Sequence, residues 1–463
     1  MLHFATQKLL GGPNHTETNT GDISITPTDR SIACLSVRFP LEFDFSNPNA
    51  RSLERKQIEH HMRLCTIATS GFEVLFSTVG SEPLLAEAAS HYMITSGTSP
   101  IRELSDNMDK NCINHGERGE LVAALLIMQA RDAAIKGSER RWIYVREFME
   151  SLLGASAAQT TTLLPYKVHS SEDKKPLADR FEGARMWFNH VVKIQKADLI
   201  NVQYLWKFIT RGAMVLCANN QPGVDLVIPI CYSGDKLSRD NVTAILIQVK
   251  NNQTFGENIH SYLFDAMDPF HINLFNKDML SPLPIIRMVF ALASKQDVVK
   301  RMVPPQARTT SQARATRQTT RQSEQPDPYT SYDLWCAGIS KSTFPVIGDD
   351  ESASYQKILD RTRFPGRGYP MSKVHEVDYP EEVAKRKARL LRCFDALVAG
   401  DEDLNPKGGL QQKGKQRSGG DKDLNPKGGS RQKGKQRAGG DEDLNPKGKS
   451  RQKGKQRAGG SGA

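Results

Sequence analysis

Three polar residues near the ends of two apolar runs could together hold a cation and a phosphate. Asp225 stands at the entry of the run 224–230, and Gln248 and Lys250 stand near the end of the run 242–250. Side chains two apart on a strand point to one face of the sheet. A hairpin of the two runs would therefore bring a carboxylate, a carboxamide oxygen and an ammonium group to one point.

These groups suit metal-dependent cleavage of a phosphodiester. A hard cation such as magnesium prefers oxygen ligands, which Asp225, Gln248 and the backbone carbonyl of Val249 could supply. Lys250 would then stand near an attacking water or a phosphate oxygen, where its charge offsets the charge built up during cleavage. Each half alone is typical of a turn or a solvated strand edge, so the indication is their joint spacing of 23 residues, from 225 to 248.

The elements around these residues follow from periodicity and turn residues. Residues 213–218, 224–230 and 242–250 predict a meander of three antiparallel strands. Helices are expected over 81–90, opened by a Ser cap, and over 118–134, 197–210, 257–266 and 381–398, and further strands at 284–293, Leu334 and Phe344. The order around the candidate site is helix, three antiparallel strands, helix, strand.

The stretches Gly223-Val-Asp225-Leu-Val and Ile247-Gln248-Val-Lys250-Asn resemble the PD-(D/E)xK superfamily of restriction-endonuclease-like nucleases. Within it they are similar to the Mrr-like and Holliday-junction-resolvase-like branches, in which Gln replaces the acidic residue. The resemblance implies a restriction-endonuclease-like α/β sandwich with a mixed sheet of at least four strands. It also implies hydrolysis of DNA with Mg, or Mn, as the cofactor. Through the stretches 81–89 and 332–338, the whole chain is also similar to expanded, mostly uncharacterised fungal proteins that carry such a domain.

The same resemblance implies a further metal ligand, Glu120, because family members often carry a Glu on the first core helix. Roughly a hundred residues separate Glu120 from Asp225, whereas in the family core that helix runs almost directly into the first strand. Either an insertion lies between them or Glu120 is not the equivalent residue. An acidic residue in the first turn of a helix is also favoured by the helix dipole alone.

Composition divides the chain into five parts. Residues 401–460 repeat a unit of 20 residues three times, and each copy has one Leu among many Gly, Pro and charged residues, too little apolar surface to fold. We expect a disordered N-terminus over 1–25, a mainly helical region over 26–114, a nuclease-like α/β domain over 115–365 with a disordered insertion at about 303–328, a basic amphipathic helix over 366–400, and a disordered tail over 401–463.

The charge of the chain predicts the class of partner. The formal net charge is +11, and residues 401–460 carry 16 Lys or Arg against 8 Asp or Glu. Basic segments track phosphates without reading sequence, so nucleic acid is the expected partner, and the resemblance to the nucleases implies DNA as the favoured one. Two alternatives stay open: a catalytically inactive nuclease-fold protein that binds nucleic acid, and a scaffold that binds a protein partner.

The sequence also bears on compartment. No apolar run reaches the ~20 residues of a membrane helix, and the first residues do not resemble a secretory signal. We therefore expect an intracellular protein, nuclear or cytoplasmic, that is not secreted and has no membrane partner. The seven cysteines are scattered and never spaced as Cys-x-x-Cys, which indicates neither a disulfide framework nor a cysteine zinc site.

Overall fold

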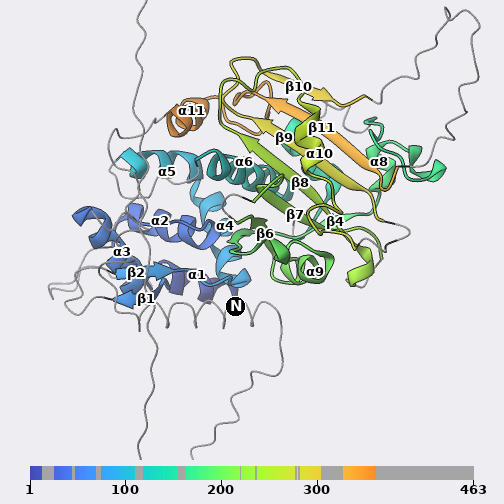
Figure 1. Ribbon diagram of the computed structural model, residues 1–463. Helices are drawn as coiled ribbons and strands as arrows, with labels where there is room; N and C mark the ends of the chain where they lie inside the picture. The colour runs from blue at the N-terminus through green and yellow to red at the C-terminus, as the bar shows by residue number, and fades with distance from the viewer. Residues whose placement is uncertain are drawn as a thin grey trace, which may run out of the picture. The chain divides into compact units, whose positions relative to one another are not determined.

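A mixed nine-stranded sheet forms the centre of the described chain (Figure 1). The computed structural model describes residues 1–360 apart from 13–24, 44–46, 69–74, 110–117, 139, 155–161, 219–220, 235–236, 277–278, 280–281 and 304–326. The sheet strands are β3 (Ile143–Tyr144), β4 (Arg185–Met186), β5 (His190–Lys193), β6 (Ala213–Leu216), β7 (Leu226–Cys231), β8 (Val242–Lys250), β9 (Ile285–Ala291), β10 (Val298–Arg301) and β11 (Ser331–Ala337).

The strand order places the predicted meander in the middle of this sheet. Strands follow one another as β10, β11, β9, β8, β7, β4 and β3, and β6 pairs with β7 and with β5. β6, β7 and β8 are antiparallel neighbours, whereas β8, β9 and β11 run parallel. The expected meander and the expected mixed sheet of at least four strands are therefore confirmed.

The helices of the described chain begin and end as follows: α1 (Leu2–Leu9), α2 (Pro27–Arg38), α3 (Pro48–His60), α4 (Pro83–Ser96), α5 (Pro100–Asp109), α6 (Arg118–Ile135), α7 (Val145–Leu153), α8 (Leu177–Arg180), α9 (Val202–Thr210), α10 (Ser261–Ala266) and α11 (Ser352–Asp360). The described residues also form three short 3-10 helices, η2 (Ser171–Lys174), η3 (Ala197–Leu199) and η4 (Arg239–Asn241). Local sequence sets several of the ends. For example, the Asn201 side chain caps α9 by accepting from two backbone N–H groups.

Alternating side chains of the sheet enter two separate cores. On one face Leu226, Ile247 and Met288 belong to the core that contains α6 and α7. On the other face Leu246 and Val289 pack in a core with residues of α9 and α10. Strands covered on both faces read as continuous apolar runs, which is the pattern of β8 and β9. Helices therefore cover both sides of the central strands.

The N-terminal helices join the first of these cores. Arg38 at the end of α2 is fully buried, donates to both carboxylate oxygens of Asp132 in α6 at 2.7 and 2.9 Å, and donates to the carbonyl of Asn189 at 3.2 Å. Burial opposes ionisation of Asp132, but the guanidinium groups of Arg38 and Arg131 hold the pKa of that carboxyl below its usual value. This network ties the first helices to α6 and to the sheet.

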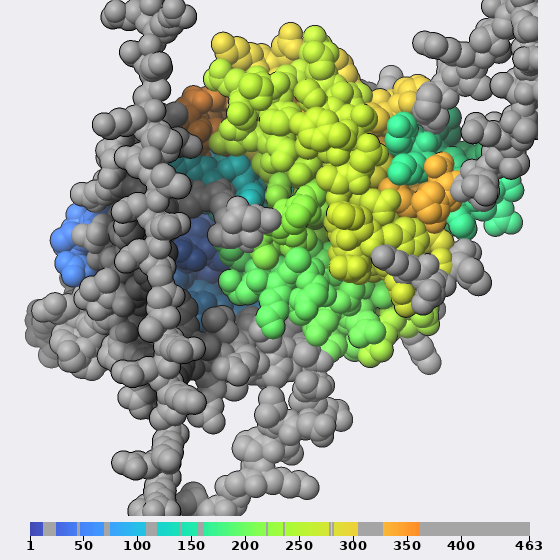
Figure 2. Space-filling view, in the orientation of Figure 1, coloured from blue at the N-terminus to red at the C-terminus, as the bar shows by residue number. Residues whose placement is uncertain are grey.

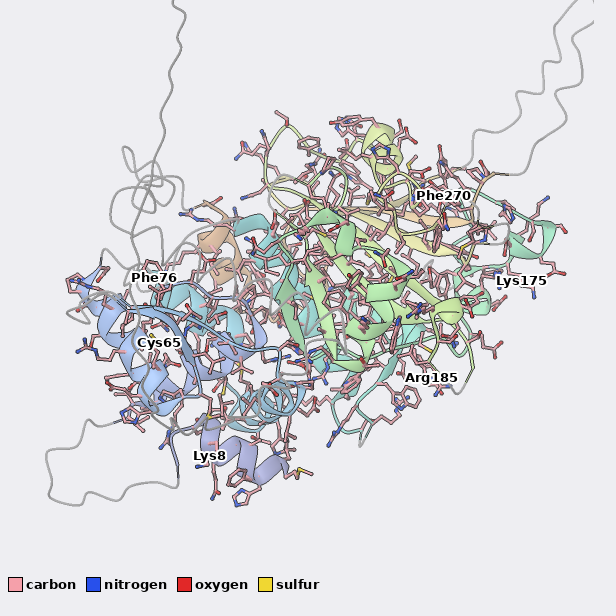
Figure 3. All side chains as sticks on the ribbon, turned by 60° about the horizontal axis from the view of Figure 1, so that its bottom comes forward. Lys8, Cys65, Phe76, Lys175, Arg185 and Phe270 are labelled. Carbon is pink, nitrogen blue, oxygen red and sulfur yellow. The ribbon has the colours of Figure 1, made fainter. Side chains whose placement is uncertain are left out.

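The region 26–114 contains four helices and one hairpin among its described residues. The hairpin joins β1 (Leu64–Ala68) to β2 (Leu75–Thr78), is antiparallel, and carries Cys65 and Phe76, which Figure 3 labels. The described residues fall within one compact unit, Met1–Leu404. The expected boundary at residue 114 stays a prediction.

Several expected elements differ from the structure. The N-terminus expected to be disordered over 1–25 forms α1 in its first residues, because Ala5 and Leu9 are buried there. The segment at Phe344 is not a strand but a series of turns, in which Phe344 N–H donates to the Ser340 carbonyl at 2.8 Å and the ring fills the core. An apolar run can thus be buried without pairing.

The two helices that flank the meander in the chain are shorter than expected. The helix predicted over 257–266 begins only at Ser261, and that over 197–210 divides into a 3-10 turn and α9. Ser81 does not cap α4, since its hydroxyl lies 2.8 Å from His190 Nε2. Most of the predicted insertion at 303–328, the basic helix over 366–400 and the repeat tail over 401–463 lie outside the described residues.

Within the part of the chain that the structure describes, no helix is both long and apolar enough to cross a membrane.

Candidate active site

Three antiparallel strand ends place a thiol, a carboxylate and an amide side by side. Leu216 of β6 pairs with Leu226 of β7, which pairs with Ile247 of β8. One residue further on, Cys217 N–H donates to the Asp225 carbonyl at 2.9 Å, and Asp225 N–H donates to the Ile247 carbonyl at 2.9 Å. Asp225 therefore lies between Cys217 and Gln248 in one row across the sheet.

The Asp225 carboxylate is held over the end of β8. Its Oδ2 accepts a hydrogen bond from the backbone N–H of Val249 at 2.6 Å. This bond adds a side-chain contact between the two strands just beyond the last backbone pair, Leu226 with Ile247. Asp225 is half-buried. The Asp225 carboxylate, which the sequence predicted as a site residue, is therefore held next to residues 248–250, as the predicted hairpin requires.

Gln248 presents an oxygen that the protein does not satisfy. The residue is 6% exposed, and its Oε1 is buried with no hydrogen-bond partner among the described residues. A buried acceptor without a donor costs roughly 1–3 kcal/mol, so such atoms are uncommon in folded proteins. A bound water or a cation would offset this cost, and a carboxamide oxygen is a suitable ligand for a hard ion.

Lys250 is the last residue of β8 and shares the face of Gln248 by strand alternation. It is half-buried, and its ammonium lies 5.9 Å from the centre of the Phe255 ring. Asp225, Gln248 and Lys250 are thus gathered at one end of the β7–β8 hairpin.

Glu120 reaches the same end of the sheet from the other core. A β-carbon on Gly119, its neighbour, would lie 3.1 Å from Asn251 Cβ and 3.3 Å from Val249 Cγ1, so α6 begins in tight contact with the end of β8. Burial raises the pKa of the Cys217 thiol well above its usual value, and the charges of Asp225 and then Glu120 raise it further. The charges of both carboxylates therefore raise the pKa of the same thiol.

The residues between Glu120 and Asp225 form additional structure. They contain α7, α8, α9, the antiparallel pair β3 and β4, and β5, which pairs in parallel with β6. These strands extend the sheet beyond β7, while α6 keeps its contact with β8. Glu120 and Asp225 therefore lie at the same end of the sheet although these elements separate them in the chain.

The described residues contain no group of three or more His, Cys, Asp and Glu side chains that could hold a metal ion. A cation at this site would depend on the amide of Gln248 and on backbone oxygen as well as on carboxylates. The ligand roles of Asp225, Gln248, Glu120 and the Val249 carbonyl, and the use of Mg or Mn, stay predictions.

Two residues of the site were not selected from the sequence. Cys217 could have been found by continuing the meander register one residue past Leu216, since it falls opposite Asp225. Gly119 carried a weaker signal, a glycine in the first turn of an otherwise strong helix, and the structure shows that β8 approaches it closely. Both lie where separate elements meet.

The fold and these residues define a mixed α/β protein with a polar site at the end of a three-stranded meander. The chain belongs to the family described as "Domain of unknown function (DUF8736)", whose model matches residues 28–283. No curated protein and no solved structure matches the chain.

Proposed function

We propose that this protein is a metal-dependent phosphodiesterase, a nuclease of the PD-(D/E)xK type with DNA as the favoured substrate. The observation that carries the proposal is the row of Asp225 beside the unsatisfied oxygen of Gln248, with Lys250 on the same face. The element order is consistent with it, because α9, β6, β7, β8, α10 and β9 follow the order of helix, three antiparallel strands, helix and strand that the sequence predicts around these residues.

The residues suggest a division of tasks. Asp225, Gln248 and Glu120, with the Val249 carbonyl, would hold a divalent cation, which would stabilise negative charge on the phosphate. Asp225 is kept in position by the Val249 N–H. Lys250 would face the phosphate and offset the charge that accumulates when water attacks phosphorus and the ester oxygen leaves.

The test is cleavage of supercoiled plasmid and of single-stranded DNA by the full chain in Mg, in Mn and in chelator. We expect cleavage that needs metal and falls by about 100-fold or more in Asp225→Asn and Lys250→Ala, since each removes charge stabilisation from the reacting centre.

Matched variants separate the site from general charge effects. Asp240→Asn makes the same change in η4, before the opposite end of β8, and Lys136→Ala removes an exposed ammonium just past the far end of α6. Both should cleave like the wild type. Equal activity in Asp225→Asn, Lys250→Ala and wild type, with folding verified by circular dichroism, would refute the proposal.

A further inference from the structure

The segment after Lys250 turns back across the sheet on the site's own face. Asn252 begins the turn, accepting from Thr254 N–H through its side chain and from Phe255 N–H through its carbonyl, each at 3.0 Å. The Gly256 carbonyl then accepts from the Trp335 indole N–H at 3.0 Å. Trp335 lies on β11, two strands beyond β8, so this segment crosses β9 and forms one wall beside the site.

The far end of this wall is also fixed. Lys300 of β10 pairs in register with Trp335, and its ammonium donates to the Glu257 carbonyl at 2.9 Å and to its carboxylate at 3.1 Å. The segment therefore spans from β8 to the edge strand, with bonds along its length. In Figure 2 this part of the chain and α10, in yellow-green, form exposed surface.

The wall carries a cluster of rings around His260, which we name the aromatic strip: Phe255, His260, Tyr262 and Trp335. The His260 ring centre lies 5.3 Å from that of Phe255, 5.5 Å from that of Trp335 and 5.8 Å from that of Tyr262. Since the Lys250 ammonium lies 5.9 Å from the Phe255 ring, the strip begins at a residue of the candidate active site.

Core packing explains Trp335 and the half-buried Phe255, but it does not explain Tyr262. Trp335 is fully buried and bonded, as a core indole should be. Tyr262 is 57% exposed, although Leu263 and Phe264 beside it in α10 are buried in the core. An exposed ring against a half-buried histidine gains little from burial, so packing gives no reason for its position.

A cation followed by accessible rings is the arrangement by which proteins hold single-stranded nucleic acid. The cation contacts the backbone phosphate and an unpaired base stacks on the ring, whichever base it is. Bases within a duplex are already stacked on their neighbours and cannot occupy such a ring.

We propose that the aromatic strip, through Tyr262 and His260, stacks an unpaired base of single-stranded nucleic acid whose phosphate lies at Lys250. The position of that phosphate rests on the proposed function, whereas the stacking itself does not require cleavage. The site would then act on single strands, or on unpaired segments and ends, in preference to an intact duplex.

The test measures binding of the wild-type full chain in chelator, where no cleavage occurs, by fluorescence anisotropy. Three probes are compared: a single-stranded oligonucleotide, the same strand with abasic positions, and the matched duplex. The abasic strand keeps the phosphates and lacks the bases, so it removes the contribution of basic segments elsewhere in the chain.

We expect the normal single strand to bind more tightly than the abasic strand. Tyr262→Ala should weaken the normal strand by about 5- to 100-fold and leave the abasic strand unchanged, because stacking on one ring contributes that much. Tyr262→Phe keeps the ring and should bind like wild type. Phe4→Ala removes another exposed ring, on α1, and should have no effect.

Three results would overturn the inference: no binding of the single strand, equal binding of normal and abasic strands, or no effect of Tyr262→Ala. Cleavage is measured separately. A protein that cleaves DNA but ignores Tyr262→Ala would refute the strip alone, and one that shows the Tyr262 effect without cleavage in any metal would refute the proposed function alone.

Discussion

The α-carbon of Gly223 faces the carbonyl oxygen of Ala266 so closely that a β-carbon on residue 223 would overlap that oxygen. Gly223 also has a φ of +85°, in the left-handed region. It lies two residues before Asp225, and Ala266 is the last residue of α10. The entry to β7 is therefore packed directly against the helix that follows β8.

Gly223→Ala should lower the free energy of unfolding by about 3 kcal/mol or more, because it adds both backbone strain and a clash with a backbone oxygen. Gly137→Ala is the matched control, since Gly137 has a similar φ of +78° but open space around it. That variant should lose only about 1 kcal/mol. Urea denaturation measures both, and equal losses would show that contact with α10 is unimportant.

Gln248→Leu should leave the free energy of unfolding unchanged or raise it by about 1 kcal/mol, because it removes a buried acceptor that has no donor. Gln129→Leu is the control, since the Gln129 amide donates to the Val346 carbonyl and to Glu351 and accepts from the Tyr355 hydroxyl. That variant should be destabilised by about 2 kcal/mol. Similar losses of unfolding free energy in both variants would mean that Gln248 Oε1 does have a hydrogen-bond partner.

Gln248→Glu tests the same position for cation binding. A carboxylate at this buried site should lower the melting temperature without metal, and millimolar Mg should restore it if the oxygen faces a cation. Differential scanning fluorimetry with and without Mg gives the answer. The proposed metal site would be contradicted by a variant that Mg stabilises no more than it stabilises wild type.

Glu120→Gln should raise the Mg concentration for half-maximal cleavage by about 10-fold, because a neutral amide attracts a cation less than a carboxylate does. Glu172→Gln makes the same change at an exposed position in η2 and should behave as wild type. A Mg titration of the cleavage rate compares them. Unchanged Mg dependence in Glu120→Gln would mean that Glu120 only interacts with the dipole at the start of α6 and does not bind the metal.

Stability should fall in mild acid because of His190. Burial, with the charges of Arg211 and Arg38, lowers the pKa of His190 to about 4. The unfolded chain, with a pKa of about 6.5, binds the proton first, so stability present at pH 7 is lost as the pH falls below about 6.5 toward 4. Between pH 7 and pH 5 this loss is about 2 kcal/mol.

His190→Gln should reduce that pH dependence. Burial also lowers the pKa of His61, but that contribution is common to both proteins and cancels in the comparison. Urea denaturation at the two pH values measures the difference. The same loss in variant and wild type would contradict the assignment to His190.

The sequence predicted the meander because its evidence is local. Alternating or continuous apolar runs and the turn residues between them define β6, β7 and β8 without reference to the rest of the chain. The parallel pairing of β8 with β9 and of β9 with β11 depends on contacts between distant segments, and β10, a short strand of two Val, a Lys and an Arg, has no distinct pattern. The strand expected at Phe344 was wrong because burial does not require pairing.

The candidate site was predictable in its residue types but not in its surroundings. Asp225, Gln248 and Lys250 could be placed together because strand alternation and one hairpin suffice. The contact of Gly119 with Val249 arises where α6 meets β8 on one face of the sheet. The unsatisfied Gln248 oxygen and the rings around His260 depend on the other face, where α10 and β11 pack. Such meetings depend on the whole fold, which no local pattern specifies.

The family match ends at residue 283, two residues before β9 begins at Ile285. A recombinant fragment ended there would keep β8 but remove the parallel strand that covers its edge, and β8 is buried along almost its whole length. The fragment would display a long apolar strand with unpaired backbone groups, a template for aggregation. The segment matched by the family model is thus shorter than the segment that the central sheet needs in order to fold.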